Sequence, residues 1–359
     1  MNHARLYDIM SGDDRSLSAS ASRLGLSVLE PGYRLAIALR NKQFDLGWRK
    51  PARLPRPVIS VGNVTTGGTG KTPLVIELAK RLLEQGSHPA VLMRGYMPDQ
   101  AGATSDEAQE IADELGSAVP VQPNPNRVEG AQRVLDKHPE TTVFLLDDGF
   151  QHRQVYRDLD IVLIDATRPF GFDRLLPRGL LREPVGNVRR ADAVIVTRGD
   201  LIARDVLTAL DQRIETLTGN APIAHAVSQW SGYRTGDEQQ PEDHLNNLKV
   251  VGVCAIGNPD AFTKMLQDAA GEVLHLHAFD DHHDYSSDEI RGLLLDAGKR
   301  GADAVVITEK DWVKFKPLMG DDAMSQGAPP VLRPALKVGF LKGAQQVDQM
   351  LKSVVSPPR

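Results

Sequence analysis

PVISVGNVTTGGTGKTP occupies residues 57–73 and joins three local patterns in a fixed order. The β-branched run from Val58 to Val61 predicts a short buried strand. A glycine-rich turn follows this run and ends in Lys71-Thr72. Apolar residues then recur at the spacing of a helix, at Leu74, Val75, Leu78, Ala79 and Leu82. Strand, glycine-rich turn, Lys-Thr and helix in this order predict a phosphate-binding loop.

Each part of this loop has a chemical role. Glycines let backbone N–H groups curl around phosphate oxygens, and a helix N-terminus adds partial positive charge. Lys71 can reach the terminal phosphates, and the Thr72 hydroxyl can hold Mg²⁺. Thr65 stands where the strict pattern G-x-x-x-x-G-K-[ST] has glycine, and a chance glycine-rich turn is the alternative. The residues expected to bind the nucleotide are Thr65, Thr66, Gly67, Gly68, Thr69, Gly70, Lys71 and Thr72.

Length and composition restrict the class of protein. A chain of 359 residues can hold two domains. Hydrophobic residues make up 41% and charged residues 25%, which is ordinary for a soluble globular protein. The net charge of −5 argues against bulk nucleic-acid binding. The single cysteine, Cys254, excludes an internal disulfide framework and is expected to be a buried strand residue. The sequence has no long apolar run and no secretory signal.

The N-terminal segment differs in composition from the rest. Residues 1–23 are rich in Ser and Ala and are expected to be loosely ordered. Residues 31–56 contain seven basic residues and one acidic residue, a local charge of +6, among apolar side chains that include Phe44 and Trp48. Such a basic amphipathic segment suits the surface of an anionic membrane. The alternative is a helix packed on the catalytic domain with its basic face in solvent.

Further short apolar runs predict the strands that bring side chains to this loop. Pro89–Met93 ends in Arg94-Gly95-Tyr96, and Val143–Leu146 ends in Asp147-Asp148. An apolar strand ending in an acidic residue is the second half of a nucleoside triphosphatase site, so one of these aspartates should hold Mg²⁺. Ile161–Asp165 and Val194–Thr197 are expected to be further parallel strands.

Residues 168–184, RPFGFDRLLPRGLLREP, are too irregular for a helix and too polar for a core. We expect them to form a loop at the site. Glu183 is a candidate ligand for the metal or for a water, and Arg174, Arg178 and Arg182 suit an anionic substrate. A solvated basic loop is the alternative.

The polar stretch TGDEQQPEDH, residues 235–244, marks a domain boundary. Val250–Cys254, Val273–Leu276 and Ala304–Thr308 predict the strands of a second α/β unit. After the middle strand, FDDHHDY, residues 279–285, places two His among three Asp. Such a group could bind a metal or supply a general base or its partner.

The motifs together resemble the tetraacyldisaccharide 4′-kinase family, the lipid A 4′-kinases of Gram-negative bacteria. The blocks that carry the resemblance run in order from about Ala36 to Phe340: PVISVGNVTTGGTGKTP, MRGY, SDE, LLDDGFQHR, PFGFDRLLPRGLLREP, FDDHHDY and TEKDWVKF. The resemblance implies transfer of the γ-phosphate of ATP to the 4′-hydroxyl of a tetraacyldisaccharide 1-phosphate, forming lipid IVA. It also implies ATP and Mg²⁺ as cofactors, a lipid substrate and the cytoplasmic face of the inner membrane as the place of action.

The resemblance also implies roles for single residues. Asp106 would be the base that receives the proton of the sugar hydroxyl, assisted by His282, with Lys71 on the phosphates. The implied ligands around Mg²⁺ and phosphate are Thr72, Asp147, Asp148, Gln151 and Glu183. The implied contacts to the substrate are Arg94, Tyr96, Glu107, Arg127, His152 and Arg182.

The expected fold is α/β: a phosphate-loop domain with a mainly parallel sheet and a second, smaller α/β domain that closes over the cleft. The expected division is an N-terminal segment (1–48), the kinase domain (49–224), a linker (225–248) and the smaller domain (249–359). We expect a peripheral cytoplasmic monomer that binds no nucleic acid. The alternatives are a partition- or cell-division-type ATPase and a non-catalytic nucleotide switch. Both could share the phosphate loop, but partition-type ATPases lack DDGFQHR, and a switch would not turn over a lipid acceptor.

Overall fold

The computed structural model describes residues 3–95, 106–235, 238–240, 242–256, 259–280, 283–319 and 328–355. The chain divides into two compact units. The larger contains Asp8–Val227 and Val338–Arg359, and the smaller contains Met1–Tyr7 and Ser228–Lys337. Strands and helices alternate in both, which confirms the predicted α/β class.

The larger unit is built on a parallel sheet with the strand order β7-β6-β5-β1-β4-β2-β3. Every residue of β1 is buried, as is typical of a parallel sheet covered on both faces. The strands are β1 (Val58–Asn63), β2 (Pro89–Met93), β3 (Val121–Pro123), β4 (Val143–Asp147), β5 (Leu159–Asp165), β6 (Ala193–Thr197) and β7 (Ala224–Thr235). The strands predicted within this unit are therefore all confirmed.

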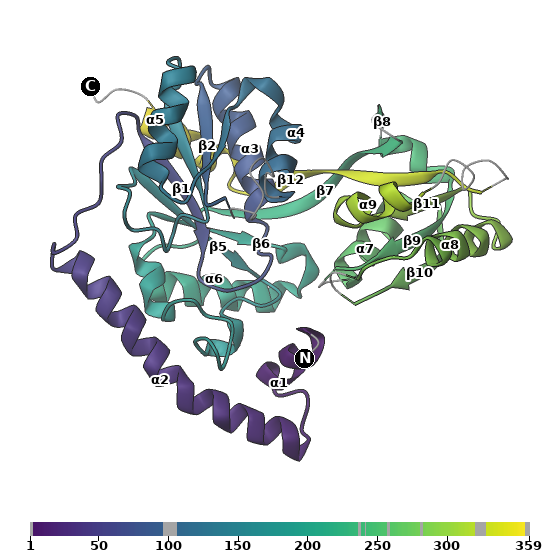
Figure 1. The fold of residues 1–359 in the computed structure, drawn as a ribbon, viewed down its shortest axis with the longest axis horizontal. Coiled ribbons are helices and arrows are strands. Elements are labelled where there is room, and N and C mark those ends of the chain that lie inside the picture. The colour runs from purple at the N-terminus through teal and green to yellow at the C-terminus, as the bar shows by residue number, and fades with distance from the viewer. Residues whose placement is uncertain are drawn as a thin grey trace. The chain divides into compact units, whose positions relative to one another are not determined.

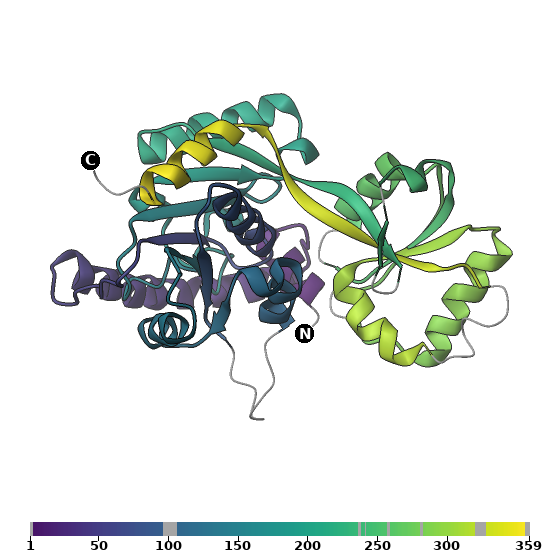
Figure 2. The ribbon, with the colours of Figure 1, turned by 90° about the horizontal axis from the view of Figure 1, so that it is seen from above.

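Helices cover both faces of this sheet (Figure 1). One face packs against α3 (Lys71–Glu84), α4 (Asp106–Leu115) and α10 (Ala344–Val355), and the opposite face against α5 (Arg127–Lys137) and α6 (Arg204–Thr218). Figure 2 shows α10, in yellow, within the larger unit. Short 3-10 helices in the chain are η1 (Gly116–Ala118), η2 (Gly171–Asp173), η3 (Val185–Arg190), η4 (Gly199–Leu201), η5 (Glu242–Asn247) and η6 (Lys316–Leu318).

The N-terminal segment is helical. It forms α1 (His3–Ser11) and the long helix α2 (Leu17–Asp45), whose first turn is capped by the Ser16 hydroxyl accepting from the Ala19 N–H. The expectation of loose order is thus wrong for residues 3–23. The Arg23 guanidinium donates to the carbonyl oxygens of Ile9 at 3.3 Å and Asp14 at 2.6 Å, which ties the end of α1 to α2.

The smaller unit has the strand order β10-β9-β11-β12-β7, with β8 (Glu238–Gln240) beside β7. Its other strands are β9 (Lys249–Cys254), β10 (Glu272–Ala278), β11 (Ala304–Ile307) and β12 (Val331–Lys342), and its helices are α7 (Pro259–Ala269), α8 (Ser287–Lys299) and α9 (Glu309–Phe315). Cys254 is buried in β9, as predicted, and burial raises the pKa of its thiol to about 12.

The division of the chain differs from the expected one in three places, the first being that residues 8–48 belong to the larger unit and do not form a segment of their own. Residues 224–235 continue as strand β7, where a polar linker was expected to begin at residue 225. Residues 338–359 belong to the larger unit, because β12 carries the chain back and α10 buries Val347 and Leu351 in that unit's core. Within the described residues, no helix is long and apolar enough to cross a membrane.

Candidate nucleotide and phosphoryl-transfer site

The loop between β1 and α3 has the conformation that its glycines predict. Gly67 and Gly70 have positive φ, and Gly70 caps α3 without a hydrogen-bonding side chain among the described residues. The first N–H groups of α3 are therefore available to an anion. Asn63 donates its amide to the Thr69 hydroxyl at 2.9 Å, and the Thr197 hydroxyl donates to the Thr69 carbonyl at 3.0 Å. These contacts hold the loop in place from two strands, β1 and β6.

The turn after β4 packs directly on the end of β1. A Cβ at Gly62 would lie 2.5 Å from the Cβ of Phe150 and 2.6 Å from its backbone nitrogen. The Gly149 N–H donates to the Val61 carbonyl at 3.1 Å, and Asp148 has a φ of 50°. This close approach places both aspartates of the turn beside the phosphate-binding loop.

The two aspartates have different environments. Asp148 accepts from Arg182 at 2.8 Å and 2.7 Å, and its Oδ1 lies 3.6 Å from Lys71 Nζ. Burial alone would raise the pKa of Asp148, but Lys71 and Arg182 hold it below its ordinary value. Asp147 is 4% exposed, and burial, only partly offset by Lys71, raises its pKa to about 6. Its Oδ1 has no hydrogen-bond partner among the described residues.

These donors fit a magnesium ion. Asp147 has a buried carboxylate oxygen free of protein partners in the described chain, and Thr72 lies in the first turn of α3. No group of three or more His, Cys, Asp or Glu side chains in the described ranges could hold a metal ion by itself. Mg²⁺ is ordinarily held by one or two carboxylates together with substrate phosphates and water, so a sparse oxygen site is what it requires.

A group of basic side chains lies near the aspartates. Arg127, the first residue of α5, is only 4% exposed, and its Nε has no partner among the described residues. Burial and the neighbouring charge of Arg94 lower the pKa of Arg127. The pKa of His152 is lowered to about 4. Burial is the largest cause, and the positive charges of Arg127, Arg157, Arg40 and Arg94 add to it. His152 is therefore neutral at pH 7 within a strongly positive group that would attract an anion.

The expected catalytic pair cannot be placed. Tyr96 and His282 lie outside the described residues, as does the side chain of Asp106, whose backbone begins α4. Glu107 is exposed in the first turn of α4. His283 is described: its ring stacks on Phe279 with centroids 4.6 Å apart, and its Nε2 lies 3.3 Å from Glu289. The pairing of Asp106 with His282 stays a prediction.

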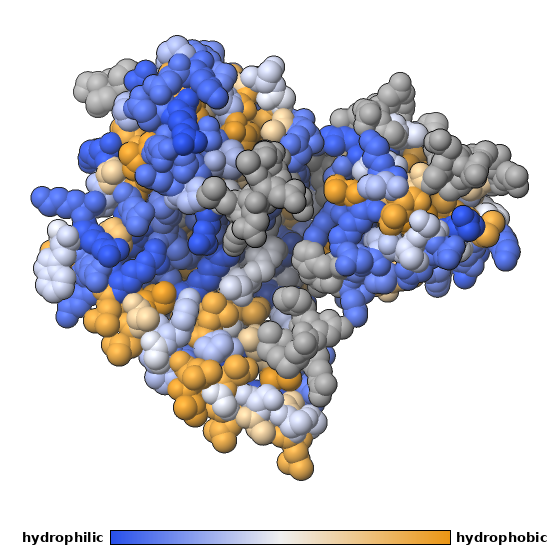
Figure 3. Space-filling view, viewed as in Figure 1, coloured by the Kyte–Doolittle hydropathy of each residue, from blue (hydrophilic) through white to orange (hydrophobic). Residues whose placement is uncertain are grey.

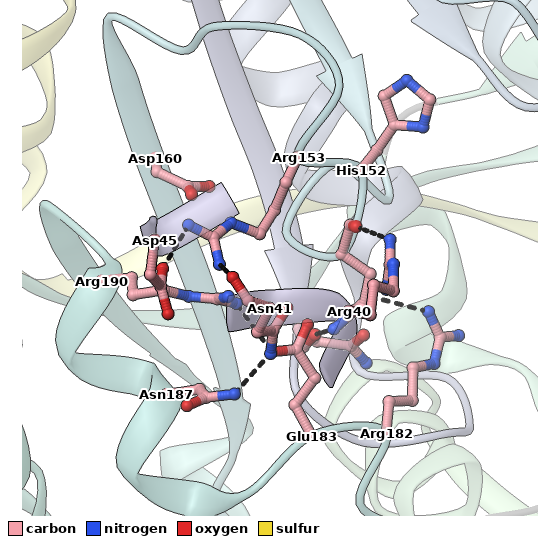
Figure 4. Close-up of polar contacts among 12 residues, drawn as sticks. Arg40, Asn41, Asp45, His152, Arg153, Asp160, Arg182, Glu183, Asn187 and Arg190 are labelled. Atoms are coloured by element: carbon pink, nitrogen blue, oxygen red, sulfur yellow. Dashed lines mark hydrogen bonds and ion pairs between the residues drawn. The ribbon is translucent and has the colours of Figure 1, made fainter. Parts of the chain in front are cut away.

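The structure places Glu183 in an internal polar network (Figure 4), with its Oε1 lacking a hydrogen-bond partner among the described residues, and its role as a ligand for the metal or for a water stays a prediction. Its side chain is 0% exposed. Its Oε2 accepts from Asn41 at 2.9 Å, Asn187 at 2.7 Å and Arg190 at 2.9 Å. Gln151 has a bridging position, because its amide donates to the Asn63 carbonyl at 2.8 Å and its oxygen accepts from Arg182 at 3.3 Å.

Sequence reasoning missed the residues of α2 that contact this site. The Tyr33 hydroxyl donates to the Arg182 carbonyl, Arg40 donates to the Gln151 carbonyl, and Asn41 binds Glu183. A signal was present in the sequence: Glu30, Tyr33 and Asn41 share one helical face with Phe44, and Glu30, Asn41 and Phe44 are buried. Polar residues on the helix face that also carries core residues predict polar partners that are buried with them elsewhere in the chain.

The LpxK family, described as tetraacyldisaccharide-1-P 4′-kinase, matches residues 22–356 of this chain. The chain belongs to this kinase family. A tetraacyldisaccharide 4′-kinase of Halothermothrix orenii is 36% identical over 338 residues, which cover 86% of this chain and 87% of that protein. A second, from Syntrophus aciditrophicus, is 36% identical over 318 residues, covering 82% of this chain and 84% of that protein. The structure of LpxK from Aquifex aeolicus in complex with ATP is 28% identical, covers 93% of this chain and 99% of that one, and has a TM-score of 0.68.

Family membership makes this chain a kinase, and the solved LpxK of Aquifex aeolicus binds ATP. It confirms the resemblance that the motifs predicted from the sequence. The alternatives of a partition-type ATPase and a nucleotide switch are not favoured, because the family match extends through both structural units.

Proposed function

We propose that this kinase transfers the γ-phosphate of ATP to the 4′-hydroxyl of a tetraacyldisaccharide 1-phosphate and so forms lipid IVA in lipid A biosynthesis. One observation supports this proposal most directly. A phosphate-binding loop, a buried carboxylate oxygen that has no partner among the described residues, and a group of basic side chains all lie at one end of the β1-β4-β2 sheet. The first two suit a nucleotide with its metal, and the third suits an anionic acceptor.

On the nucleotide side, the backbone of residues 65–72 and the N-terminus of α3 would bind the phosphates. Lys71, held 3.6 Å from Asp148, would contact the terminal phosphates. Thr72 and Asp147 would hold Mg²⁺, which would neutralise part of the negative charge on the phosphate oxygens. Asp148 orients both Lys71 and Arg182, and Gln151 also contacts Arg182. The protein would therefore contribute to phosphoryl transfer by positioning charged side chains around the phosphates.

On the acceptor side, Arg94, Arg127 and Arg182 would bind the phosphate of the lipid head group. Guanidinium groups suit this task, because their planar fork binds phosphate oxygens in pairs. His152 can form hydrogen bonds to the sugar without adding charge, because its pKa of about 4 leaves it neutral at pH 7.

The acceptor hydroxyl must lose a proton as its bond to phosphorus forms. Asp106 would accept this proton, and His282 would orient the carboxylate and share the proton. We expect the two residues to act as one unit. Asp106→Ala and His282→Ala should each lower kcat by about 10²–10⁴-fold, as positioned acid–base groups do. The double variant should be little worse than the poorer single variant.

The test is transfer of labelled phosphate from ATP to a tetraacyldisaccharide 1-phosphate, measured for wild type and these three variants. Absence of transfer by the folded wild-type protein would refute the proposed reaction. Losses that multiply in the double variant would show that Asp106 and His282 act separately. A larger loss in His283→Ala would move the role to the neighbouring histidine and leave the reaction intact.

A peripheral position on the anionic cytoplasmic face of the inner membrane, as a monomer, completes the proposal. Leu24, Val28, Leu35 and Leu39 of α2 and Leu46 at its C-cap recur every four or seven positions and are 51–71% exposed. Figure 3 shows this hydrophobic surface along α2. An exposed apolar stripe of this length next to a basic segment suits a helix lying in the membrane interface.

Vesicle binding tests this position. The double substitution Leu35→Ser with Leu39→Ser should weaken binding to vesicles containing phosphatidylglycerol by more than about tenfold, since burying each leucine is worth about 1.5–3 kcal/mol. Val206→Ser is a matched control, because Val206 is 51% exposed but belongs to α6 and not to the stripe on α2. Unchanged binding of the leucine variant would refute membrane contact through this stripe.

A further inference from the structure

Helix α2 has an unusual distribution of side chains. Most of its leucines are exposed, whereas its buried face includes a carboxylate and an amide, Glu30 at 4% and Asn41 at 7% exposure. Burying polar groups is costly unless they find partners, so this face is built for specific contacts rather than for packing alone.

One set of these contacts reaches the residues just before η3. The Asn41 amide donates to Glu183, and the Tyr33 hydroxyl donates to the carbonyl oxygen of Arg182 at 3.0 Å. These two neighbours connect to the phosphate site, because the Arg182 N–H donates to the Val64 carbonyl at 2.8 Å and its guanidinium binds Asp148. Arg182 is therefore held by α2 from its backbone while its side chain faces the site.

A second set reaches the turn that carries the aspartates. Arg40 donates to the carbonyl oxygen of Gln151, and Arg153 donates to the Asn41 carbonyl at 3.2 Å. Arg153 also pairs with Asp45 at 2.7 Å (Figure 4). One turn and a half of α2, from Arg40 to Asp45, thus holds the turn that follows Asp148.

We propose that α2 positions the catalytic site: Tyr33, Asn41 and Glu183 are positioning residues that fix Arg182, and through it Asp148 and Lys71, in their working geometry. The helix with the exposed leucines is then also the element that aligns the phosphate-binding side chains. Misplacement of such groups by about 1 Å can cost about 10²-fold in rate even when the mutation lies far from the chemistry. For its kinetic readout this inference rests on the proposed transfer reaction.

Two variants test it in the full-length protein, with the lipid acceptor supplied in excess detergent micelles so that membrane binding does not limit the rate. Asn41→Leu keeps the side-chain size and removes the amide donor. Tyr33→Phe removes only the hydroxyl and guards against failure of the first variant to fold. Ser27→Ala is the matched control, because that hydroxyl donates within α2 to the Arg23 carbonyl.

Both variants should lower kcat by about tenfold or more while the Kd for ATP changes less than about twofold, and Ser27→Ala should match wild type. Combining Tyr33→Phe with Arg182→Ala should add nothing to the loss caused by Arg182→Ala, since the hydroxyl acts through that residue. Wild-type kcat in the folded variants, or losses that multiply in the double variant, would overturn the inference.

Amide hydrogen exchange provides a readout that needs no acceptor. Exchange of residues 180–183 should accelerate in Asn41→Leu and Tyr33→Phe and stay unchanged in Ser27→Ala. Unchanged exchange in all variants would overturn the inference whatever the activity. If the wild-type protein transferred no phosphate to the acceptor but exchange of residues 180–183 accelerated in the variants, the proposed reaction would be refuted and the positioning role would stand.

Discussion

Replacing Asp147 by Asn should stabilise the metal-free protein at neutral pH and at the same time remove its activity. Burial raises the pKa of Asp147 from 3.8 to about 6, so the folded state holds this proton more tightly than the unfolded state does. A difference of about two pH units corresponds to about 3 kcal/mol, because each unit is worth about 1.4 kcal/mol. Ionised Asp147 therefore opposes folding by about that amount at pH 8.

The raised pKa of Asp147 also predicts how the stability difference between Asp147→Asn and wild type varies with pH. The cost is fully present above the folded pKa of about 6, and it disappears as the pH falls below 3.8, where the carboxyl is protonated in both states. The stability gained by Asp147→Asn should thus be largest at pH 8 and fall to a small fraction of that gain near pH 4. Urea-induced unfolding, followed by circular dichroism in the presence of a chelator, measures this difference at each pH.

The neighbouring aspartate is a matched control with the opposite sign. Ion pairs with Lys71 and Arg182 hold the pKa of Asp148 below its ordinary value, so this carboxylate contributes stability above pH 4 and loses it as the pH falls further. Asp148→Asn should therefore destabilise the protein at pH 7. If Asp147→Asn destabilises the metal-free protein at pH 8, or if its effect does not vary with pH, the reasoning from burial is refuted.

Three further perturbations test the site. Gly62→Ala should lower the free energy of unfolding, measured by thermal unfolding, by about 1–3 kcal/mol, because the new methyl group would overlap the backbone of the turn after β4. Gly186→Ala is the control and should change this free energy by less than about 0.5 kcal/mol, because no atom of the described residues lies within 4 Å of the added methyl group. Lys71→Ala should abolish transfer in a folded protein while Lys80→Ala does not, and near-normal turnover of the former would exclude the nucleotide assignment. Arg127→Met should raise the KM for the lipid acceptor more than the KM for ATP; an equal rise in both constants would contradict a role on the acceptor side.

The strands were predictable because their signal is local. Val58, Ile59 and Val61 are β-branched and buried on both faces of a parallel sheet, so the sequence itself shows an uninterrupted apolar run. The phosphate-binding loop was predictable for a similar reason, since Gly67 and Gly70 adopt the positive φ that only glycine takes up readily. The polarity of residues 168–184 was misleading, because Phe170, Leu175 and Leu181 are buried beneath the loop.

The network around Glu183 could not be predicted, because its signal is not local. Asn41 and Glu183 are 142 positions apart, and neither residue shows by itself that the other is its partner. The sequence shows a glutamate beside a site arginine, and only the arrangement in space reveals Asn187 and Arg190 around its Oε2. Burial and hydrogen-bond partners decide between such roles.

The return of the chain to the larger unit has a consequence for synthesis on the ribosome. Val347 and Leu351 of α10 complete the core that contains Leu74 and Leu78 of α3, next to the nucleotide loop. The unit that begins near residue 8 therefore cannot finish its core until residues 344–355 have emerged, whereas the strands β8 to β11 of the inserted unit emerge earlier. The core surface that α10 will cover on the nascent nucleotide-binding unit therefore stays exposed to solvent while more than a hundred residues of the other unit are translated.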